Sequence, residues 1–483
     1  MQRSQKDLQK KPKKGLGSNR EIMMTTYMFV LLFLGMMGFL GYYVVNNQHD
    51  LLNNNYNTRQ ELLTEQNYRG TIYSKDGEVL AQTVVDSQGT ETRVYPYENM
   101  FSHIIGYSTK GRSGVESIAN YYLINSNTSL ANKAANLDAD LKNPGDRVIT
   151  TLDVDLQKTA SNEMGIYKGA ILVTEVATGK ILALVSKPDF DPNKIDDIWN
   201  DLISDSNSSV LVNRATQGLY PPGSTFKIIT TLEYMRENPV TCQNYNYNCI
   251  GYYKIDDIRI NCYHNINHGQ VNLTTAFAKS CNSSFADIGM TLDRVQFADT
   301  LNDLLFNQNL PLNLSYSKSS IQMSEETTDS QMIQASIGQG RTQMTPVHLH
   351  MITQAIAYNG VLMRPYVVDR VENDVGNIIK SFHPESYKSL MTEEESAFLM
   401  GLMEEVVKTG TGTKLSGRSY TAAGKTGSAE YSEEKGESHA WFTGYAPADH
   451  PEIAVTIIME GAGSGGDYAV PIARRIFDAY FNQ

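Results

Sequence analysis

The sequence of 483 residues contains no internal repeat and no low-complexity domain, so its length predicts two folded units plus a tail. Positive charge is outnumbered by negative charge outside the first 21 residues. The whole chain carries a net charge of −12, whereas residues 1–21 carry +5, which leaves about −17 on the remainder. A chain with so acidic a main part is a poor candidate for binding nucleic acid.

Long apolar runs are also scarce, and the clearest one extends from Ile22 to Val45. At 1.5 Å per residue a helix over this run reaches about 36 Å, enough to cross a bilayer. No small-residue cleavage site follows Val45, so the run predicts a retained anchor, not a signal peptide. The basic residues before it predict a cytoplasmic tail over 1–21 and an extracellular remainder. A buried core helix is the alternative, which the flanking charge disfavours.

Three short motifs stand in one order along the chain: Ser224-Thr225-Phe226-Lys227, Ser280-Cys281-Asn282 and Lys425-Thr426-Gly427. Their first residues are 56 and 145 residues apart, so the motifs meet only in a folded domain. The order S-x-x-K, S-x-N, K-T-G is the pattern of penicillin-binding proteins and class A β-lactamases.

Further copies of two of these motifs lie in the wrong context. Ser315–Lys318 is in a loop rich in Asn and Ser, Ser432–Lys435 is in a charged turn, and Lys408-Thr409-Gly410 ends a helical stretch. Ser224 instead follows a Pro-Pro-Gly turn and opens an apolar run with helical spacing. Lys425 lies between two β-like runs, as a substrate-binding strand requires.

The first motif predicts a nucleophile with its own base. A serine hydroxyl needs a base within hydrogen-bond reach, and Ser224 and Lys227 share one helix face. Lys227 must be neutral to accept a proton, and both burial and a nearby cation, Lys425, would lower its pKa. The backbone N–H groups of Ser224 and Ser428 are the predicted oxyanion hole, helped by the helix N-terminus.

The other two motifs predict the groups that handle the substrate. Ser280 is the expected proton relay between Lys227 and a leaving amine, and the Asn282 amide is expected to hold a substrate carbonyl. Lys425 and Thr426 would bind a terminal carboxylate. Gly427 is expected where a substrate backbone lies flat on the strand. Taken alone, Ser280 and Asn282 would be an ordinary loop between helices.

The chain resembles the monofunctional class B penicillin-binding proteins, most of all the short PbpA type, from about Arg59 to the C-terminus. Arg69–Ala81 is similar to the family motif that follows the anchor, although Ser74-Lys75 stands where the family usually has Asp-Arg. The salt bridges expected from an Asp-Arg pair are therefore not carried over to this chain. Further similar segments are Arg93–Pro96, His103–Tyr107, Gly111–Glu116, Leu152–Gln157, Gly338–Gly340, Thr345-Pro346 and His439–Pro447.

The order of predicted elements indicates an α+β fold. Strands come first, near 148–152, 169–175 and 180–186, helices follow, and strands between 420 and 459 precede an amphipathic helix over 468–481. This order predicts one antiparallel sheet, built from both ends of the domain and flanked by helices. The resemblance names it the serine β-lactamase/penicillin-binding transpeptidase fold. The predicted segments are a tail (1–21), a transmembrane helix (22–45), a stalk and small pedestal domain (46–145) and a transpeptidase domain (146–483).

Cysteine is scarce, with four in the chain. Cys281, inside the second motif, is expected to be a small buried apolar residue. A hairpin turning near Ile255-Asp256 would set Cys249 opposite Cys262, so that a disulfide between them is one alternative. A zinc site of Cys249, Cys262, His264 and His268 is the other. His268-Gly269 resembles a structural His-Gly pair of the family that holds no metal, so neither a metal nor a cofactor is predicted.

The resemblance implies a peptidoglycan D,D-transpeptidase that forms a serine acyl-enzyme, crosslinks stem peptides and is acylated by β-lactams. It also implies a membrane-embedded SEDS glycosyltransferase as partner. A β-lactamase or a D,D-carboxypeptidase is the enzymatic alternative. A non-catalytic sensor of β-lactams or muropeptides is the other alternative, but a cytoplasmic tail of about 21 residues leaves no room for a signalling domain. The pattern does not distinguish a role in division from one in elongation.

Overall fold

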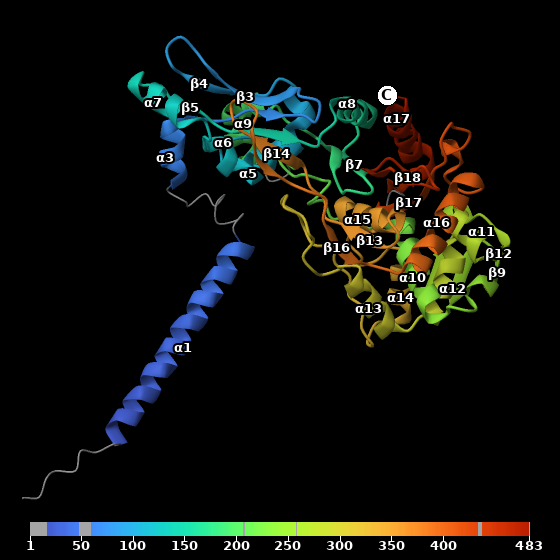
Figure 1. Cartoon of the computed structure of the whole chain (residues 1–483). Coiled ribbons are helices and arrows are strands. Elements are labelled where there is room, and N and C mark those ends of the chain that lie inside the picture. The colour runs from blue at the N-terminus through green and yellow to red at the C-terminus, as the bar shows by residue number, and fades with distance from the viewer. Residues whose placement is uncertain (1–16, 48–58, 206–207, 257, 433–436, 483) are drawn as a thin grey trace, which may run out of the picture. The chain divides into compact units, whose positions relative to one another are not determined.

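The computed structural model describes residues 17–47, 59–205, 208–256, 258–432 and 437–482 (Figure 1). The chain forms two units, residues 1–58 and 59–483. The first unit contains α1 (Gly17–Asn46), and its segment Arg20–Val45 is long and apolar enough to cross a membrane. The predicted span 22–45 lies within that segment. Of the predicted stalk, residues 48–58 lie outside the described residues, and α3 (Arg59–Gln66) opens the second unit.

The part of the second unit that carries the three motifs is organised by a five-stranded sheet in the order β17-β18-β19-β7-β8, and every neighbouring pair is antiparallel. Its strands come from both ends of the domain, which confirms the predicted antiparallel sheet. They are β7 (Gly169–Glu175), β8 (Ile181–Lys187), β17 (Ala423–Ser432), β18 (Glu437–Ala446) and β19 (Ile453–Met459).

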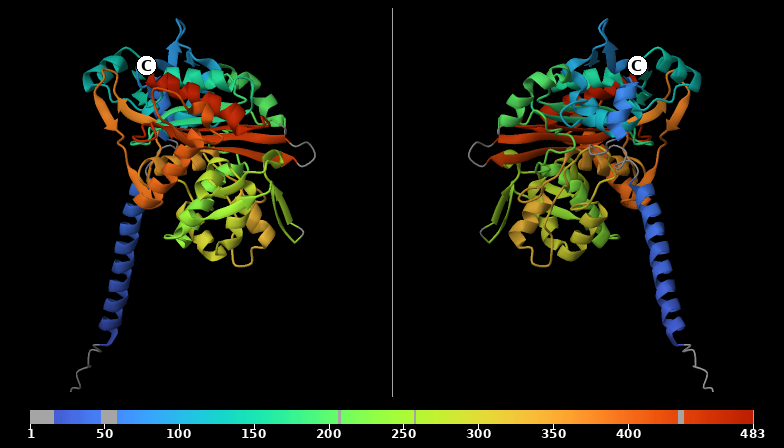
Figure 2. Two further views of the ribbon diagram at one scale, coloured as in Figure 1. Left: turned by 90° about the vertical axis from the view of Figure 1, so that its right-hand side faces the viewer. Right: turned by 90° about the vertical axis from the view of Figure 1, so that its left-hand side faces the viewer.

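Both faces of this sheet are covered, because its strands alternate between two apolar cores. Ile171 and Val173 pack with the two helices α8 (Val154–Met164) and α17 (Val470–Phe481) on one face. Leu172 lies in the larger core on the other face, beneath α15 (Pro346–Ala357). Figure 2 shows α17 on one side of the sheet and the green-to-yellow helices on the other.

The helical half lies between β8 and β17 in sequence, as the predicted order of elements requires. Thr392 caps the N-terminus of its longest helix with a capping box to Glu395, which gives two otherwise unpaired amides their partners. The helices of this half are α9 (Ile195–Ser204), α10 (Lys227–Glu237), α11 (Leu273–Ala278), α12 (Asn282–Thr291), α13 (Arg294–Asp303), α14 (Asp329–Ser336), α15 and α16 (Glu393–Lys408).

The pedestal contains a second sheet, six-stranded, in the order β15-β14-β6-β2-β3-β4. This sheet takes strands from both sides of residue 145, because β14 pairs with β6 and β6 pairs in parallel with β2. Its strands are β2 (Ile72–Tyr73), β3 (Val79–Val85), β4 (Glu91–Val94), β6 (Arg147–Thr150), β14 (Val368–Glu372) and β15 (Ile378–Ser381).

Short elements complete the second unit. Four pairs of strands in the described residues lie outside the two main sheets. In two of them, β1 (Asn67–Tyr68) pairs with β5 (Asn143–Pro144), and β13 (Val361–Met363) pairs with β16 (Ser386–Ser389). The pedestal helices are α4 (Ser102–Ile105), α5 (Gly114–Ile118), α6 (Asn120–Ile124) and α7 (Leu130–Asp138).

The predicted hairpin near Ile255 is present, but its predicted register is wrong. The strands β10 (Tyr252–Ile255) and β11 (Ile258–Asn261) pair Tyr252 with Asn261, so Cys249 is not opposite Cys262. Cys249 instead ends β9 (Asn246–Cys249) and pairs with Gly269 of β12 (Gly269–Asn272). The structure has both cysteines as free thiols, with 3.7 Å between their sulfur atoms.

Candidate active site

The serine of the first motif lies in a tight turn that leads into a helix. Ser224 belongs to the 3₁₀ turn Gly223–Phe226, and α10 begins at the next residue, Lys227. Phe226 is fully buried against other aromatic rings and anchors this turn in the core. Ser224 itself is half-buried, whereas Lys227 is fully buried behind it. The turn therefore presents a hydroxyl to solvent with an amine beneath it.

The amine of Lys227 lies at the centre of a hydrogen-bond cluster. Its Nζ is 2.7 Å from Asn282 Oδ1 and 2.8 Å from the carbonyl oxygen of Ser280, and it lies 3.1 Å from Ser224 Oγ. It is also 3.3 Å from Ser280 Oγ. These contacts bring the first two motifs together, although 56 residues separate Ser224 from Ser280 in sequence.

These contacts orient the lone pair of a neutral Lys227. The Ser280 carbonyl and the Asn282 amide oxygen are acceptors only, so each takes one of the two hydrogens of a neutral amine. The lone pair is then left for the hydroxyl hydrogen of Ser224. Burial lowers the pKa of Lys227 to about 8, which makes the neutral form accessible near neutral pH. The Phe285 ring, 5.3 Å from Nζ, partly compensates for burial when the amine is charged.

A second buried lysine approaches from the third motif. Lys425 Nζ donates to Ser280 Oγ at 2.9 Å and to the carbonyl of Thr426 at 3.0 Å. Burial lowers the pKa of Lys425 well below its ordinary value, and the charge of Lys227 lowers it further. From the sequence we expected the charge of Lys425 to lower the pKa of Lys227. The structure shows the reverse: the charge of Lys227 lowers the pKa of Lys425. Both amines contact one hydroxyl, so the pair favours one positive charge over two.

The hydroxyl of Ser280 connects the two lysines. Ser280 lies between α11 and α12 with a positive backbone φ of 57°, a conformation that few residues other than glycine adopt. Because its Oγ accepts a hydrogen bond from Lys425, its own hydrogen is free to point toward Lys227 or toward a substrate. This geometry supports the predicted proton relay.

The strand of the third motif packs directly on the turn that carries Ser224. A Cβ on Gly427 would lie 3.1 Å from both the Pro222 carbonyl oxygen and Thr225 Cγ2. The small size of glycine therefore favours close contact between β17 and the turn, and clearance of a substrate at Gly427 stays a prediction. Gly223, with φ of 54°, faces Ser428 and Ala429 in the same way. Ser224 and Ser428 are thus neighbours, and their N–H groups remain the predicted oxyanion hole.

Sequence reasoning missed Thr411. Its Oγ1 is 2.5 Å from Thr426 Oγ1, and its backbone N–H donates to the carbonyl of Ala278. Thr411 directly follows the second Lys-Thr-Gly copy, so that copy packs between the second and third motifs although its lysine is exposed at the end of α16. A polar residue adjoining a motif copy was the only signal in the sequence. The hydroxyls of Thr411 and Thr426 thus lie together at the strand that carries Lys425.

Taken together, the arrangement supports acyl transfer through a serine ester. The half-exposed hydroxyl of Ser224 faces the buried amine of Lys227, and the hydroxyl of Ser280 contacts the amines of both lysines. The strand β17 lies beside them. Asn282 is half-buried, accepts from Lys227 and donates to the Asn261 carbonyl, which fixes its amide at the rim. The structure thus brings Ser224, Lys227, Ser280, Asn282, Lys425, Thr426, Gly427 and Ser428 into one region.

Comparison with known proteins points to the same chemistry. The family described as the penicillin binding protein transpeptidase domain matches residues 169–478, and the penicillin binding protein A dimerisation domain matches residues 69–148. The peptidoglycan D,D-transpeptidase PbpA of Mycobacterium tuberculosis is 30% identical over 85% of this chain and 88% of its own length. PbpA of Mycolicibacterium smegmatis is 29% identical over 84% of this chain and 87% of its own length.

Solved structures show the same likeness in three dimensions. Penicillin-binding protein A of M. tuberculosis in an imipenem acyl-enzyme complex superposes with a TM-score of 0.78 at 27% identity, covering 87% of this chain and all of that chain. The D,D-transpeptidase domain of a peptidoglycan glycosyltransferase from Eggerthella lenta also gives 0.78, at 28% identity over 86% of this chain and 99% of that chain.

Proposed function

The chain belongs to the penicillin-binding protein transpeptidase family, and we propose that it is a peptidoglycan D,D-transpeptidase that works through an acyl-enzyme on Ser224. The observation that carries this assignment is the Lys227 amine, which lies 3.1 Å from the Ser224 hydroxyl and has two of its other contacts to groups that only accept hydrogen bonds. The named relatives of the family are peptidoglycan D,D-transpeptidases, and their acyl-enzyme structures carry β-lactams.

In the first step, Ser224 Oγ attacks the carbonyl between two terminal D-alanines of a stem peptide while its proton passes to Lys227 Nζ. The N–H groups of Ser224 and Ser428 stabilise the oxyanion. The C–N bond then breaks, and the leaving D-alanine amine takes the proton from Lys227 through Ser280. Lys425, Thr426 and Thr411 face the position of the terminal carboxylate, and Asn282 holds an amide carbonyl of the donor.

In the second step, an amine of a neighbouring stem peptide attacks the ester carbonyl. Its proton passes back through Ser280 and Lys227 to Ser224 Oγ as the ester bond breaks. The two stem peptides are then joined by a new amide, and the serine is regenerated. A β-lactam follows the first step only. Its ring amide opens to form an ester on Ser224, and the released amine stays attached to the acyl group and does not leave the site.

We also propose the setting of this reaction. The apolar helix Arg20–Val45 anchors the chain in a membrane, with the basic tail in the cytoplasm and residues 59–483 outside. The family resemblance supplies the partner, a membrane-embedded SEDS glycosyltransferase that contacts the anchor and pedestal.

The test is covalent labelling of the full-length chain in detergent with a fluorescent penicillin, followed by mass spectrometry of the labelled peptide. We expect one long-lived adduct on Ser224 and none in Ser224→Ala. Ser315→Ala is the matched control, because Ser315 is the exposed serine of a second S-x-x-K copy, and this variant should label normally.

The same protein should transfer a stem-peptide acyl group to an added D-amino acid, and not only to water. Label that persists in Ser224→Ala overturns the assigned nucleophile. Rapid release of hydrolysed penicillin would make the protein a β-lactamase, and hydrolysis without transfer would make it a carboxypeptidase.

A further inference from the structure

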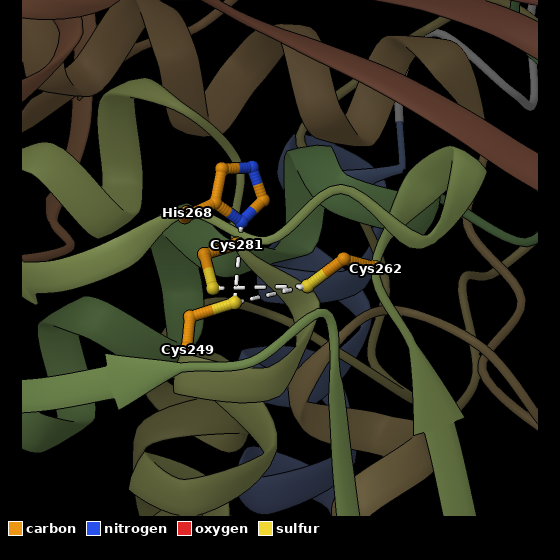
Figure 3. A group of neighbouring side chains, drawn as sticks. All are labelled: Cys249, Cys262, His268 and Cys281. Atoms are coloured by element: carbon orange, nitrogen blue, oxygen red, sulfur yellow. Dashed lines mark hydrogen bonds between the residues drawn. The ribbon is translucent and has the colours of Figure 1, made fainter.

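Three cysteines and one histidine from four separate segments converge behind the second motif. They are Cys249 at the end of β9, Cys262 just after β11, His268 just before β12, and Cys281 at the N-cap of α12 (Figure 3). The three sulfur atoms and one ring nitrogen all lie within 4.8 Å of one another. The three cysteines are almost completely buried, and His268 is half-buried.

We propose that Cys249, Cys262, His268 and Cys281 bind one zinc ion as a closed structural site. The inference does not rest on the proposed transpeptidase reaction, because none of the four ligand atoms takes part in it. It departs from two expectations from the sequence, that the chain has no metal site and that Cys281 is only a small buried apolar residue. It also replaces His264 by Cys281 in the ligand set considered there.

The distances agree with a tetrahedral ion. Zinc–sulfur bonds of about 2.3 Å place two sulfurs of a tetrahedron about 3.8 Å apart, and a zinc–nitrogen bond of about 2.0 Å places nitrogen about 3.5 Å from sulfur. The observed separations are 3.7 Å for Cys249 and Cys262, 3.8 Å for Cys262 and Cys281, and 3.4 Å between Cys249 Sγ and His268 Nδ1. The side chains therefore already have the spacing of a coordination sphere.

Hydrogen-bond donors around the sulfurs suit thiolates better than neutral thiols. The Ser283 hydroxyl lies 3.0 Å from Cys249 Sγ and 3.3 Å from the sulfurs of Cys262 and Cys281. The backbone N–H groups of Gly251 and Ser284 point at Cys249 and Cys281, each at 3.4 Å. Such second-sphere donors disperse the charge that three thiolates bring to a metal.

The chain offers an internal comparison in Cys242. This thiol is also buried, at 3% exposure, but it is not one of the clustered ligands. Cys242 therefore serves as the reference for a cysteine that acts only as a small buried apolar residue. The other three differ from it in that their sulfur atoms point toward one another and toward an imidazole, as Figure 3 shows.

Zinc binding here would leave oxidation states unchanged. Each thiol loses its proton to solvent as its Zn–S bond forms, and a neutral His268 contributes the lone pair of Nδ1. The filled site has three thiolates and one neutral imidazole around a dication, for a net charge of −1. All four positions are taken by protein, so the ion has no open position for a substrate.

The location gives the ion a positioning role. Cys281 lies between Ser280 and Asn282, and Asn282 donates to the carbonyl of Asn261, the residue before Cys262. An ion shared by Cys262 and Cys281 would tie the β10–β11 hairpin to the N-terminus of α12. It would thereby hold Ser280, with its positive φ, where both lysines reach it.

The first measurement is the zinc content and intact mass of the full-length chain in detergent. The protein is incubated with a small excess of Zn²⁺ without reductant, desalted, and analysed by elemental and denaturing mass spectrometry. We expect about one zinc per chain and the mass of the fully reduced protein. Less than about 0.1 zinc per chain, or a mass lower by two hydrogen atoms with a bond between Cys249 and Cys262, overturns the proposal.

Variants assign the ion to these residues. Cys262→Ser should lose the zinc, whereas the matched control Cys242→Ser, also a buried cysteine changed to serine, should keep it. His268→Cys should also keep the ion, because four thiolates form a zinc site, and this result does not depend on whether Cys262→Ser folds. Equal zinc in wild type and Cys262→Ser, or loss in Cys242→Ser alone, overturns the assignment.

Co²⁺ in place of Zn²⁺ adds a spectroscopic readout, the thiolate-to-cobalt charge-transfer band, which an ion held by carboxylates lacks. Its absence from cobalt-loaded wild type contradicts the site. Penicillin labelling of the same samples keeps the two proposals apart. Protein that labels at Ser224 but binds no zinc refutes the metal site alone, and zinc-loaded protein that does not label refutes the proposed function alone.

Discussion

The pedestal and the candidate active site around Ser224, called the cleft below, both bury charged side chains. They differ in whether a buried charge has an opposite charge beside it. In the pedestal, Glu116 is fully buried between Arg69 and Arg93, with carboxylate–guanidinium distances of 2.6 and 2.8 Å. Tyr95 also donates to the same carboxylate at 3.2 Å. In the cleft, Lys227 and Lys425 are fully buried, and no carboxylate of the described residues is among their hydrogen-bond partners.

The presence or absence of a counter-charge separates a buried group that stabilises the fold from a buried group that can react. Opposite charges at hydrogen-bond distance keep each other ionised, so the Arg69–Glu116–Arg93 cluster holds its protonation state and locks three segments of the pedestal together. Two like charges in a dry site destabilise each other, so the cleft favours loss of a proton. The first arrangement resists titration, and the second makes a lysine into a base.

The largest effect we expect comes from Lys227→Met, which keeps the volume but removes the base. The rate constant for acylation by a fluorescent penicillin should fall by about 10²–10⁴-fold. The free energy of unfolding should change little, because the substitution also removes a buried charge that lacks a counter-ion. Acylation is followed by stopped-flow or gel fluorescence on the full-length chain.

The matched control is Lys408→Met, which changes the exposed lysine of the second Lys-Thr-Gly copy. Its acylation rate should remain within about two-fold of wild type, since surface substitutions have small effects. If Lys227→Met acylates within ten-fold of wild type, Lys227 is not the base.

The next largest effect should come from Glu116→Gln in the pedestal. The change leaves Arg69 and Arg93 buried without their counter-charge, and the free energy of unfolding should fall by about 3–5 kcal/mol. Denaturant titration monitored by intrinsic fluorescence measures the loss. The acylation rate of the protein that stays folded should be unchanged, because the cluster touches no residue of the cleft.

Glu91→Gln is its control, because Glu91 pairs with Lys142 in the same pedestal but both side chains are about one-third exposed. This variant should lose no more than about 1 kcal/mol. A similar loss in both variants would mean that burial does not distinguish the two ion pairs.

The fold and the meeting of the three motifs could be predicted, because they depend on strong signals. Apolar runs located β7 and β8, and an amphipathic helical pattern located α17, each within a residue or two. The context of Ser224 and Lys425 separated them from their copies. The roles of the motif residues stay predictions that the experiments above test.

The register of the cysteine hairpin and the convergence of the thiols could not be predicted. A short polar hairpin has no apolar alternation to fix its register, so the turn decides it, and here Asp256 takes a positive φ of 47°. The pairing is two residues away from the expected one, and Cys281 joins the cluster from a helix cap far along the chain. The contact between Thr411 and Thr426 likewise depends on packing between segments.

The smallest effect concerns pH and separates the two regions in the same protein. The pKa of Lys227 is about 8, and the lysine must lose its proton before it accepts one. The acylation rate should therefore rise by about ten-fold between about pH 7 and about pH 9 and level off above. The measurement is the acylation rate constant as a function of pH, and a flat profile in this range contradicts a titrating Lys227.

The pedestal should contribute nothing to that profile. Burial raises the pKa of Glu116, but the charges of Arg69 and Arg93 outweigh burial and lower the pKa below its ordinary value of 4.5. The stability that this carboxylate contributes is thus present above pH 4.5 and is lost only as the pH falls through the lowered pKa. Glu116→Gln should accordingly show the same rise in acylation rate as wild type, while its loss of unfolding free energy should be constant from pH 7 to pH 9, because the unpaired arginines stay charged throughout.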